Sequence, residues 1–115
     1  MKATKISTGG VIEDIELEDG NTLADLQKHV GGYIEIISIG ATTDLVINEE
    51  GKVYGLDRNP TADALLQQLG VELLPGDFIV GNVVVIDTNS EGETDGIPAE
   101  SRGILEALRV EGADQ

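Results

Sequence analysis

Residues Leu23–Leu56 read LADLQKHVGGYIEIISIGATTDLVINEEGKVYGL, and this stretch is the part of the chain most informative about its architecture. Its first part repeats apolar residues at helical spacing, and Gly31 supplies the left-handed residue that commonly ends a helix. Thr22 and Asp25 are spaced as in a capping box, in which the hydroxyl accepts a backbone N–H and the carboxylate reaches back. The stretch therefore predicts a short helix that begins at Thr22.

A strand is predicted over residues 33–39, directly after the paired glycines. Alternation places Ile34 and Ile36 on one face of this strand, with Tyr33, Glu35 and Ile37 on the other. Glu35 is the carboxylate best placed for partial burial. Because charged residues are seldom fully buried unless they are paired, a solvent-facing Glu35 is the favoured interpretation.

A hairpin is predicted to follow, with Leu45–Ile47 and Lys52–Tyr54 as its two strands. The turn Asn48–Gly51 joins them, and Gly51 would occupy the position that needs a positive φ. On the amino-terminal side, Gly9-Gly10 predicts a turn between two further short strands.

The second helix has the clearest start signal, because Asn59 can cap it and Pro60 suits its first position. Residues 78–86 are nearly all apolar and rich in valine, which predicts a strand buried on both faces. Together these elements predict an α+β fold: a mixed, mostly antiparallel sheet of about five or six strands, with two helices on one face. Residues 1–86 form the predicted domain, 87–98 an acidic linker, and 99–115 a C-terminal helix and tail.

The charge balance narrows the function classes. The 115-residue chain has 22 acidic and 7 basic side chains, for a formal net charge of −15. Such a surface repels nucleic acid phosphates and anionic membranes, so no direct nucleic-acid binding and no membrane binding are expected. Plain solubility, a halophilic source and mimicry of a phosphate array are three explanations of this charge. The chain has no cysteine and no apolar run long enough for a membrane span, which predicts a cytoplasmic protein.

Few residue combinations support a particular chemistry. His29 is the only histidine, so one chain cannot assemble a His-dependent triad or a His-rich metal site, and its place near a helix C-terminus suits the helix dipole. The acidic run from Asp87 begins like a calcium-binding loop but has Pro98 where the closing glutamate is required. Gly31-Gly32 follows a helix and precedes a strand, whereas the glycines of a phosphate-binding loop follow a strand and precede a helix. We therefore predict no enzyme, no catalytic residue, no cofactor and no metal site.

Several separated motifs resemble the domain of unknown function 3846 family. They are Leu26–Glu35, Asn48–Lys52 with Gly55-Leu56, Asn59–Ala62, and Asp77–Val85. The resemblance covers residues 2–87 and leaves the tail outside the pattern. It implies a small protein of a bacteriophage, a plasmid, or a bacterial or archaeal genome, and it implies no known catalytic residues.

Three hypotheses for function are open. The first is a non-enzymatic accessory protein of a phage or mobile element that acts by contact with an unidentified host protein. The second is an acidic nucleic-acid mimic that blocks a host DNA-binding or restriction protein. The third is a small-molecule-binding domain or weak enzyme that uses Glu35, His29 or Tyr33 near the Gly31-Gly32 bend. The C-terminal helix is a candidate surface for homodimer formation. The candidate binding surface within the predicted domain comprises Tyr33, Glu35, Glu49, Glu50 and Tyr54.

Overall fold

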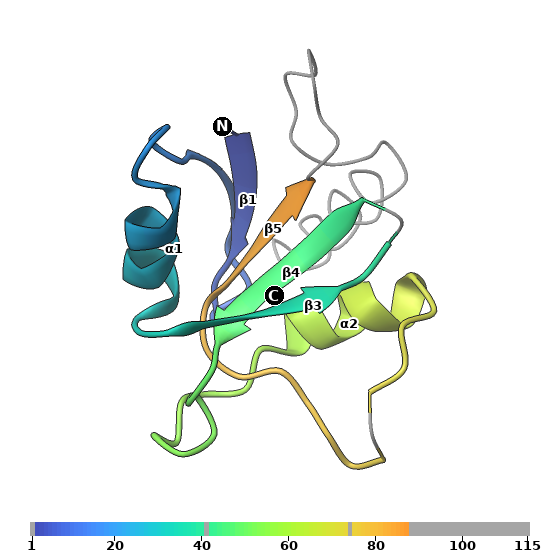
Figure 1. The fold of residues 1–115 in the computed structure, drawn as a ribbon. Coiled ribbons are helices and arrows are strands. Elements are labelled where there is room, and N and C mark those ends of the chain that lie inside the picture. Colours follow the sequence, from blue (N-terminus) through green and yellow to red (C-terminus); the bar gives the residue numbers. More distant parts are fainter. Residues whose placement is uncertain (1, 41, 74, 88–115) are drawn as a thin grey trace.

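The computed structural model describes residues 2–40, 42–73 and 75–87. Its described part contains five strands and two helices (Figure 1). In chain order they are β1 (Lys2–Ile6), β2 (Ile12–Glu16), α1 (Thr22–Val30), β3 (Ile34–Ser38), β4 (Thr43–Asn48), α2 (Pro60–Gln68) and β5 (Val83–Asp87). The predicted linker and C-terminal helix lie outside the described residues, apart from Asp87, which ends β5.

The strands form one five-stranded sheet in the order β2-β1-β5-β4-β3. β1 and β2 form the predicted hairpin around Gly9-Gly10, β3 and β4 form a second hairpin, and β5 lies between the two hairpins. Every neighbouring pair is antiparallel. The predicted α+β class is confirmed, and the described sheet is fully antiparallel because β5 runs opposite to both of its neighbours.

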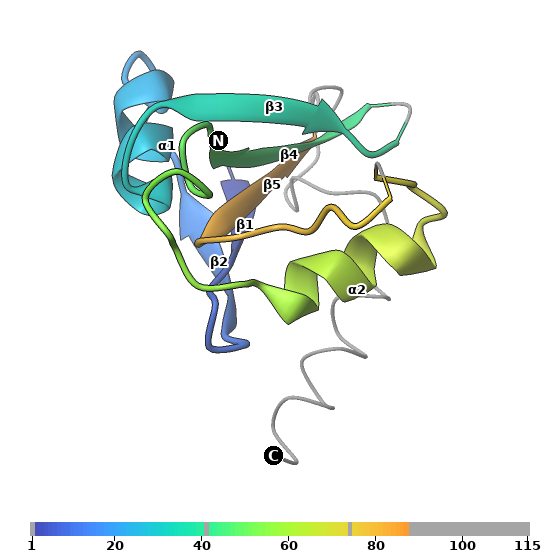
Figure 2. The ribbon, with the colours of Figure 1, turned by 90° about the horizontal axis from the view of Figure 1, so that it is seen from below.

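The two helices cover opposite faces of the sheet, which corrects the prediction that both lie on one face (Figures 1 and 2). Alternate residues of β5 separate two cores: Val83 and Val85 pack with α2, whereas Val84 and Ile86 pack with α1. All four side chains are buried, as predicted for the apolar run 78–86, but the strand begins at Val83 and not at Phe78. A strand that is apolar at every position needs a cover on each face, so two-sided packing follows from the same pattern.

The segment after β4 differs from the predicted hairpin. Residues 51–55 form turns rather than a returning strand, so the prediction of a strand over Lys52–Tyr54 is wrong. Gly51 does not have a positive φ; the glycine of this segment that does is Gly55, at 69°. A Cβ on Gly51 would instead lie 2.7 Å from Val80 Cγ2. Close approach of two segments, and not turn geometry, is the reason that this position requires glycine.

The two helices begin in different ways. Asn59 caps α2 as predicted, with its Oδ1 accepting the Ala62 N–H at 3.1 Å. The predicted capping box of α1 is wrong, because this helix has no side-chain cap bond and Thr22 Oγ1 donates to the Glu18 carbonyl. Asp25 accepts the Glu18 N–H at 2.7 Å, which fixes the chain that enters the helix. Neither of these described helices is long and apolar enough to cross a membrane.

Candidate functional site

β3 forms one edge of the sheet, with β4 as its neighbour among the described strands. The Tyr33 carbonyl accepts the Glu49 N–H at 2.8 Å, and the Ile39 N–H donates to the Thr43 carbonyl at 2.9 Å. Bonding direction alternates along an antiparallel ladder, so the N–H and C=O groups of residues 34, 36 and 38 point away from β4. The outer side of β3 thus presents backbone groups with which another strand can pair.

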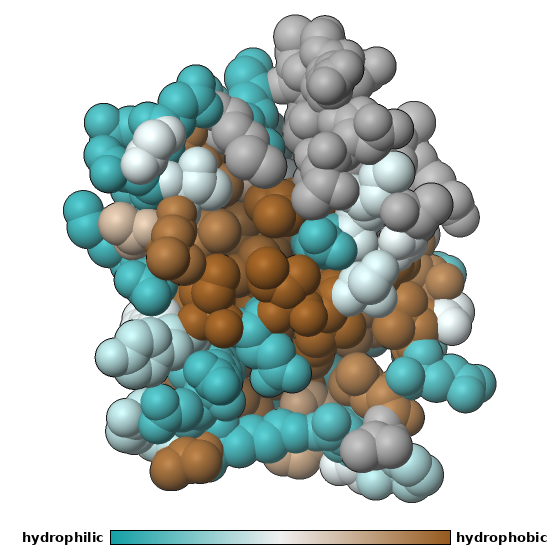
Figure 3. All heavy atoms as spheres, viewed as in Figure 1, coloured by the Kyte–Doolittle hydropathy of each residue, from teal (hydrophilic) through white to brown (hydrophobic). Residues whose placement is uncertain are grey.

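Apolar side chains accompany this open edge. Tyr33 is 67% exposed and Ile36 is 55% exposed, and apolar atoms gather across the middle of the face shown in Figure 3. The opposite edge strand, β2, instead exposes Glu13 and Asp14. Charged side chains on an edge strand discourage pairing with another chain. β2 exposes three carboxylates, whereas β3 exposes one, that of Glu35, so β3 is the edge better suited to contact.

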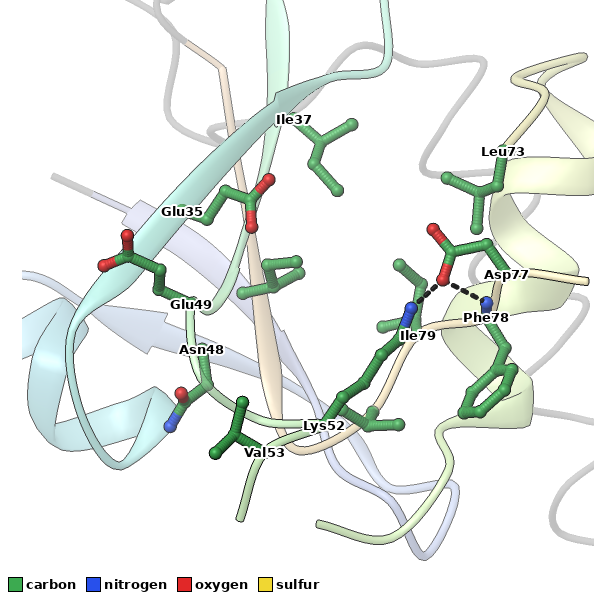
Figure 4. Close-up of a pocket in the computed structure, with 12 residues that line it drawn as sticks. Glu35, Ile37, Asn48, Glu49, Lys52, Val53, Leu73, Asp77, Phe78 and Ile79 are labelled. Atoms are coloured by element: carbon green, nitrogen blue, oxygen red, sulfur yellow. Dashed lines mark hydrogen bonds and ion pairs between the residues drawn. The ribbon is translucent and has the colours of Figure 1, made fainter. Parts of the chain in front are cut away.

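A cavity of about 140 Å³ lies beside β3, on the α2 face of the sheet. Glu35 on β3 and Asp77 on the segment before β5 lie on facing walls, and Figure 4 shows their carboxylates directed into the space between them. The volume is below the roughly 300–1,000 Å³ typical of small-molecule sites. The cavity therefore suits a single side chain better than a whole ligand. Its apolar lining includes Ile37, Ile47 and Ile79.

Lys52 spans one end of the cavity. Its ammonium group forms an ion pair with Asp77 and lies 5.0 Å from the centroid of the Phe78 ring (Figure 4). Arg58 lies over the same ring, with its guanidinium carbon 4.1 Å from the centroid. Carboxylates and aromatic faces both attract cations. The wall formed by Asp77 and Phe78 is thus a binding place for basic side chains, here supplied by the chain itself.

The structure divides the predicted surface residues between the cavity and its surroundings. Glu35 and Glu49 line the cavity, although the Glu49 carboxylate turns away from it (Figure 4). Tyr33 lies directly before β3. Glu50 and Tyr54 belong to the turn after β4, where the Tyr54 N–H donates to the Glu50 carbonyl at 3.0 Å.

Sequence reasoning missed the far wall of the cavity, which Asp77 and Phe78 provide. The apolar run from Phe78 predicts a buried strand, and this signal does not indicate what the residues at its start face. No local signal in the sequence places Asp77 opposite Glu35, because the two residues lie on segments far apart in the chain.

The Gly31-Gly32 bend, where the third hypothesis places a ligand, is filled by a side chain. Asn48 Nδ2 donates to the Val30 carbonyl at 3.1 Å, and a Cβ on the second glycine would lie 3.0 Å from that nitrogen. His29 is on α1, across the sheet from the cavity that Glu35 lines. The structure therefore does not bring the residues of that hypothesis together. Within the described residues, no group of three or more His, Asp or Glu side chains is placed to hold a metal ion.

The pKa of His29 lies below its ordinary value of 6.5, because the side chain is partly buried and the Lys5 ammonium is near; Asp25 and Glu13 oppose this more weakly. Since the folded pKa is the lower one, the unfolded chain binds the proton first as the pH falls. We expect the free energy of unfolding to decrease as the pH falls from about 7.5 to about 5.5. Denaturation in urea at a series of pH values measures this slope. His29→Gln should remove its histidine component, and an unchanged slope would contradict the assignment.

The described fold lies within one family pattern. A family model described as "Domain of unknown function (DUF3846)" matches residues 1–108. The chain belongs to the DUF3846 family. The match contains all the described elements and continues past Asp87, so the expectation that the DUF3846 pattern stops at residue 87 is wrong. No curated protein and no solved structure matches the chain.

Proposed function

We propose that this DUF3846 protein is a non-enzymatic accessory protein of a phage or mobile element that binds an extended segment of a host protein along the open edge of β3. The proposal rests on two features that occur together on this edge: backbone N–H and C=O groups that point outward, and the exposed side chains of Tyr33 and Ile36. A strand that adds to a sheet edge gains main-chain hydrogen bonds, and the flanking side chains give it specificity. The mobile-element origin rests on the family resemblance.

The alternative of a nucleic-acid mimic has less support from the charge distribution. Mimicry needs carboxylates in an unbroken row on one face. The carboxylates of β2 do not form such a row, because Glu13 lies on one face of the strand and Asp14 and Glu16 lie on the other. In the register with β1, Lys5 also lies opposite Glu13 and Lys2 lies opposite Glu16. Lysines beside the carboxylates interrupt the negative potential that a phosphate array would present.

Ile36→Lys tests the proposed contact. A lysine in the middle of an edge strand discourages strand addition, and a surface position of this kind changes stability by no more than about 0.5 kcal/mol. We expect the variant to capture the host protein at least about tenfold more weakly than the unsubstituted chain, the loss typical of a central contact residue. Quantitative affinity capture from lysate of the native host, at low and high salt, measures this, and hydrogen exchange of the amides of β3 locates the contact.

Val11→Lys is the matched control. Val11 is 57% exposed, close to the 55% of Ile36, and lies next to β2 at the far edge of the sheet. We expect this control to capture the host protein as the unsubstituted chain does. Equal losses in the two variants, or exchange protection elsewhere than on β3, would show that the proposed surface is wrong. Turnover of a small substrate by a chain that captures no partner would refute the non-enzymatic assignment.

A further inference from the structure

We infer that the segment bound along β3 is an amphipathic strand, whose basic side chains face Glu35 and the cavity and whose apolar side chains cover Ile34 and Ile36. This inference rests on the proposed function, because it names the chemistry of the partner at the same edge. Three features carry it: the direction of backbone pairing on β3, the acidic cavity on one face, and the apolar surface on the other.

The pairing geometry of β3 determines which partner side chain lies nearest to Glu35. Because residues 34, 36 and 38 bond outward, an antiparallel partner forms hydrogen-bonded pairs with them and non-hydrogen-bonded pairs with Glu35 and Ile37. In a non-hydrogen-bonded pair the Cα atoms are about 4.5 Å apart and the side chains lie close together. The partner residue opposite Glu35 therefore projects on the same face as Glu35, over the cavity.

The cavity has the chemistry to hold a basic side chain. Its apolar lining suits the methylene stem of a lysine or arginine, which packs on apolar surface while the charged head stays at the rim. Lys52 shows this mode of binding through its ion pair with Asp77 and its place beside the Phe78 ring. That ion pair is made with Asp77 and leaves the Glu35 carboxylate, on the facing wall, for a second base.

The other face of β3 suits apolar side chains. Ile34 packs against the core under α1, and Ile36 lies opposite Val46 on the same face with half of its surface exposed. Partner residues one position away from the base project to this face, because successive side chains of a strand alternate. A partner that alternates basic and apolar residues thus satisfies both faces of β3.

A second copy of this chain fits the edge less well. An antiparallel pair centred on Ile36 would place Glu35 of each copy opposite Ile37 of the other, and it would bring no base to either cavity. The net charge of −15 on each copy also opposes their approach.

Two synthetic peptides with capped ends test the inference on the full chain. One alternates lysine with valine and the other alternates glutamate with valine. We expect the lysine peptide to bind and to protect the amides of Ile34, Ile36 and Ser38 from hydrogen exchange, and the glutamate peptide to do neither. Titration followed by NMR gives both the affinity and the location.

Glu35→Lys and Asp14→Lys separate local contact from general attraction, because both variants change the net charge by the same amount. Asp14 lies on β2, four interstrand spacings from β3, or roughly 19 Å, and charges are screened beyond about 8 Å at physiological salt. We expect Glu35→Lys to weaken binding of the lysine peptide at least about tenfold, since like charges at an interface repel strongly. Asp14→Lys should weaken it less than about twofold, through the shared change in net charge.

Equal affinity for the two peptides, or equal loss of affinity for the lysine peptide in the two variants, would overturn the inference about the partner's charge. Protection of the β3 amides in the same experiment would still support a contact at this edge. Protection of β3 that rises with protein concentration alone, together with a dimer mass in ultracentrifugation, would overturn it in favour of a second copy. Undiminished capture of the host protein by Ile36→Lys would overturn the proposed function itself.

Discussion

Asn59→Ala should destabilise the fold by about 4 kcal/mol, because one buried amide joins three distant segments. Asn59 is fully buried, and its Nδ2 donates to the Ile6 carbonyl at 3.0 Å and to the Gly81 carbonyl at 2.8 Å. Its Oδ1 accepts the Ala62 N–H at 3.1 Å and so caps α2. Alanine removes the cap, which is worth about 1 kcal/mol. It also removes the donor to the buried Gly81 carbonyl, at about 1–3 kcal/mol, and one hydrogen bond to the Ile6 carbonyl, at about 0.5–1.5 kcal/mol.

Asn21→Ala is the control for this substitution. Asn21 precedes α1 as Asn59 precedes α2, but it is exposed and makes no side-chain cap bond. Its replacement should change stability by no more than about 0.5 kcal/mol. Urea denaturation of both variants measures the difference, which is large against a typical total stability of about 5–15 kcal/mol. Similar losses in the two would mean that the buried hydrogen bonds of Asn59 contribute little.

Local signals account for the parts of the fold that the sequence predicted correctly. Gly31 ends α1 with φ at 85°, Asn59 begins α2, and Gly9-Gly10 turns the first hairpin. Each of these features depends on residues within a few positions of one another. The capping box of α1 failed on the same local scale, because Asp25 accepts the N–H of Glu18 and not the N–H of Thr22.

The arrangement of the layers depends on pairings that no local pattern contains. Thr4 pairs with Val85 across most of the chain, and this pairing places β5 between the two hairpins. The placement of the helices was a different kind of error. The run Val83–Ile86 already required a cover on both faces, so the information was present in the sequence.

The cavity could not be predicted because its walls come from three separate segments. The strand pattern identifies Glu35 as a candidate, but nothing in the sequence indicates that Asp77 and Lys52 lie near it. The sequence pattern predicts a positive φ for Gly51, whereas the structure gives this glycine a packing role against Val80. A glycine in an Asn-Glu-Glu-Gly turn satisfies both explanations until the fold is known.

Gly51→Ala should destabilise the chain by about 2 kcal/mol, through steric overlap alone. The added methyl group would lie 2.7 Å from Val80 Cγ2 and 3.4 Å from Leu56 Cδ1. Valine has few alternative rotamers, so Val80 cannot turn away cheaply, and it is buried at only 7% exposure. The turn of residues 51–55 must therefore move away from the segment that precedes β5. Because Lys52 and Asp77 lie on these two segments, the same movement widens the cavity beside β3.

Gly9→Ala isolates that overlap from the effect of losing a glycine. Gly9 has no positive φ, and a Cβ there would meet nothing within 4 Å. Both substitutions restrict the unfolded chain alike, which stabilises the fold by about 0.4–1 kcal/mol where no strain arises. The difference between the two variants in urea denaturation thus measures the cost of parting the segments at Val80. If Gly51→Ala also weakens binding of the lysine peptide while Gly9→Ala does not, the distance between the cavity walls contributes to binding. If Gly51→Ala lowers the stability but leaves the affinity for the lysine peptide unchanged, the peptide contacts only the edge of β3 and Glu35.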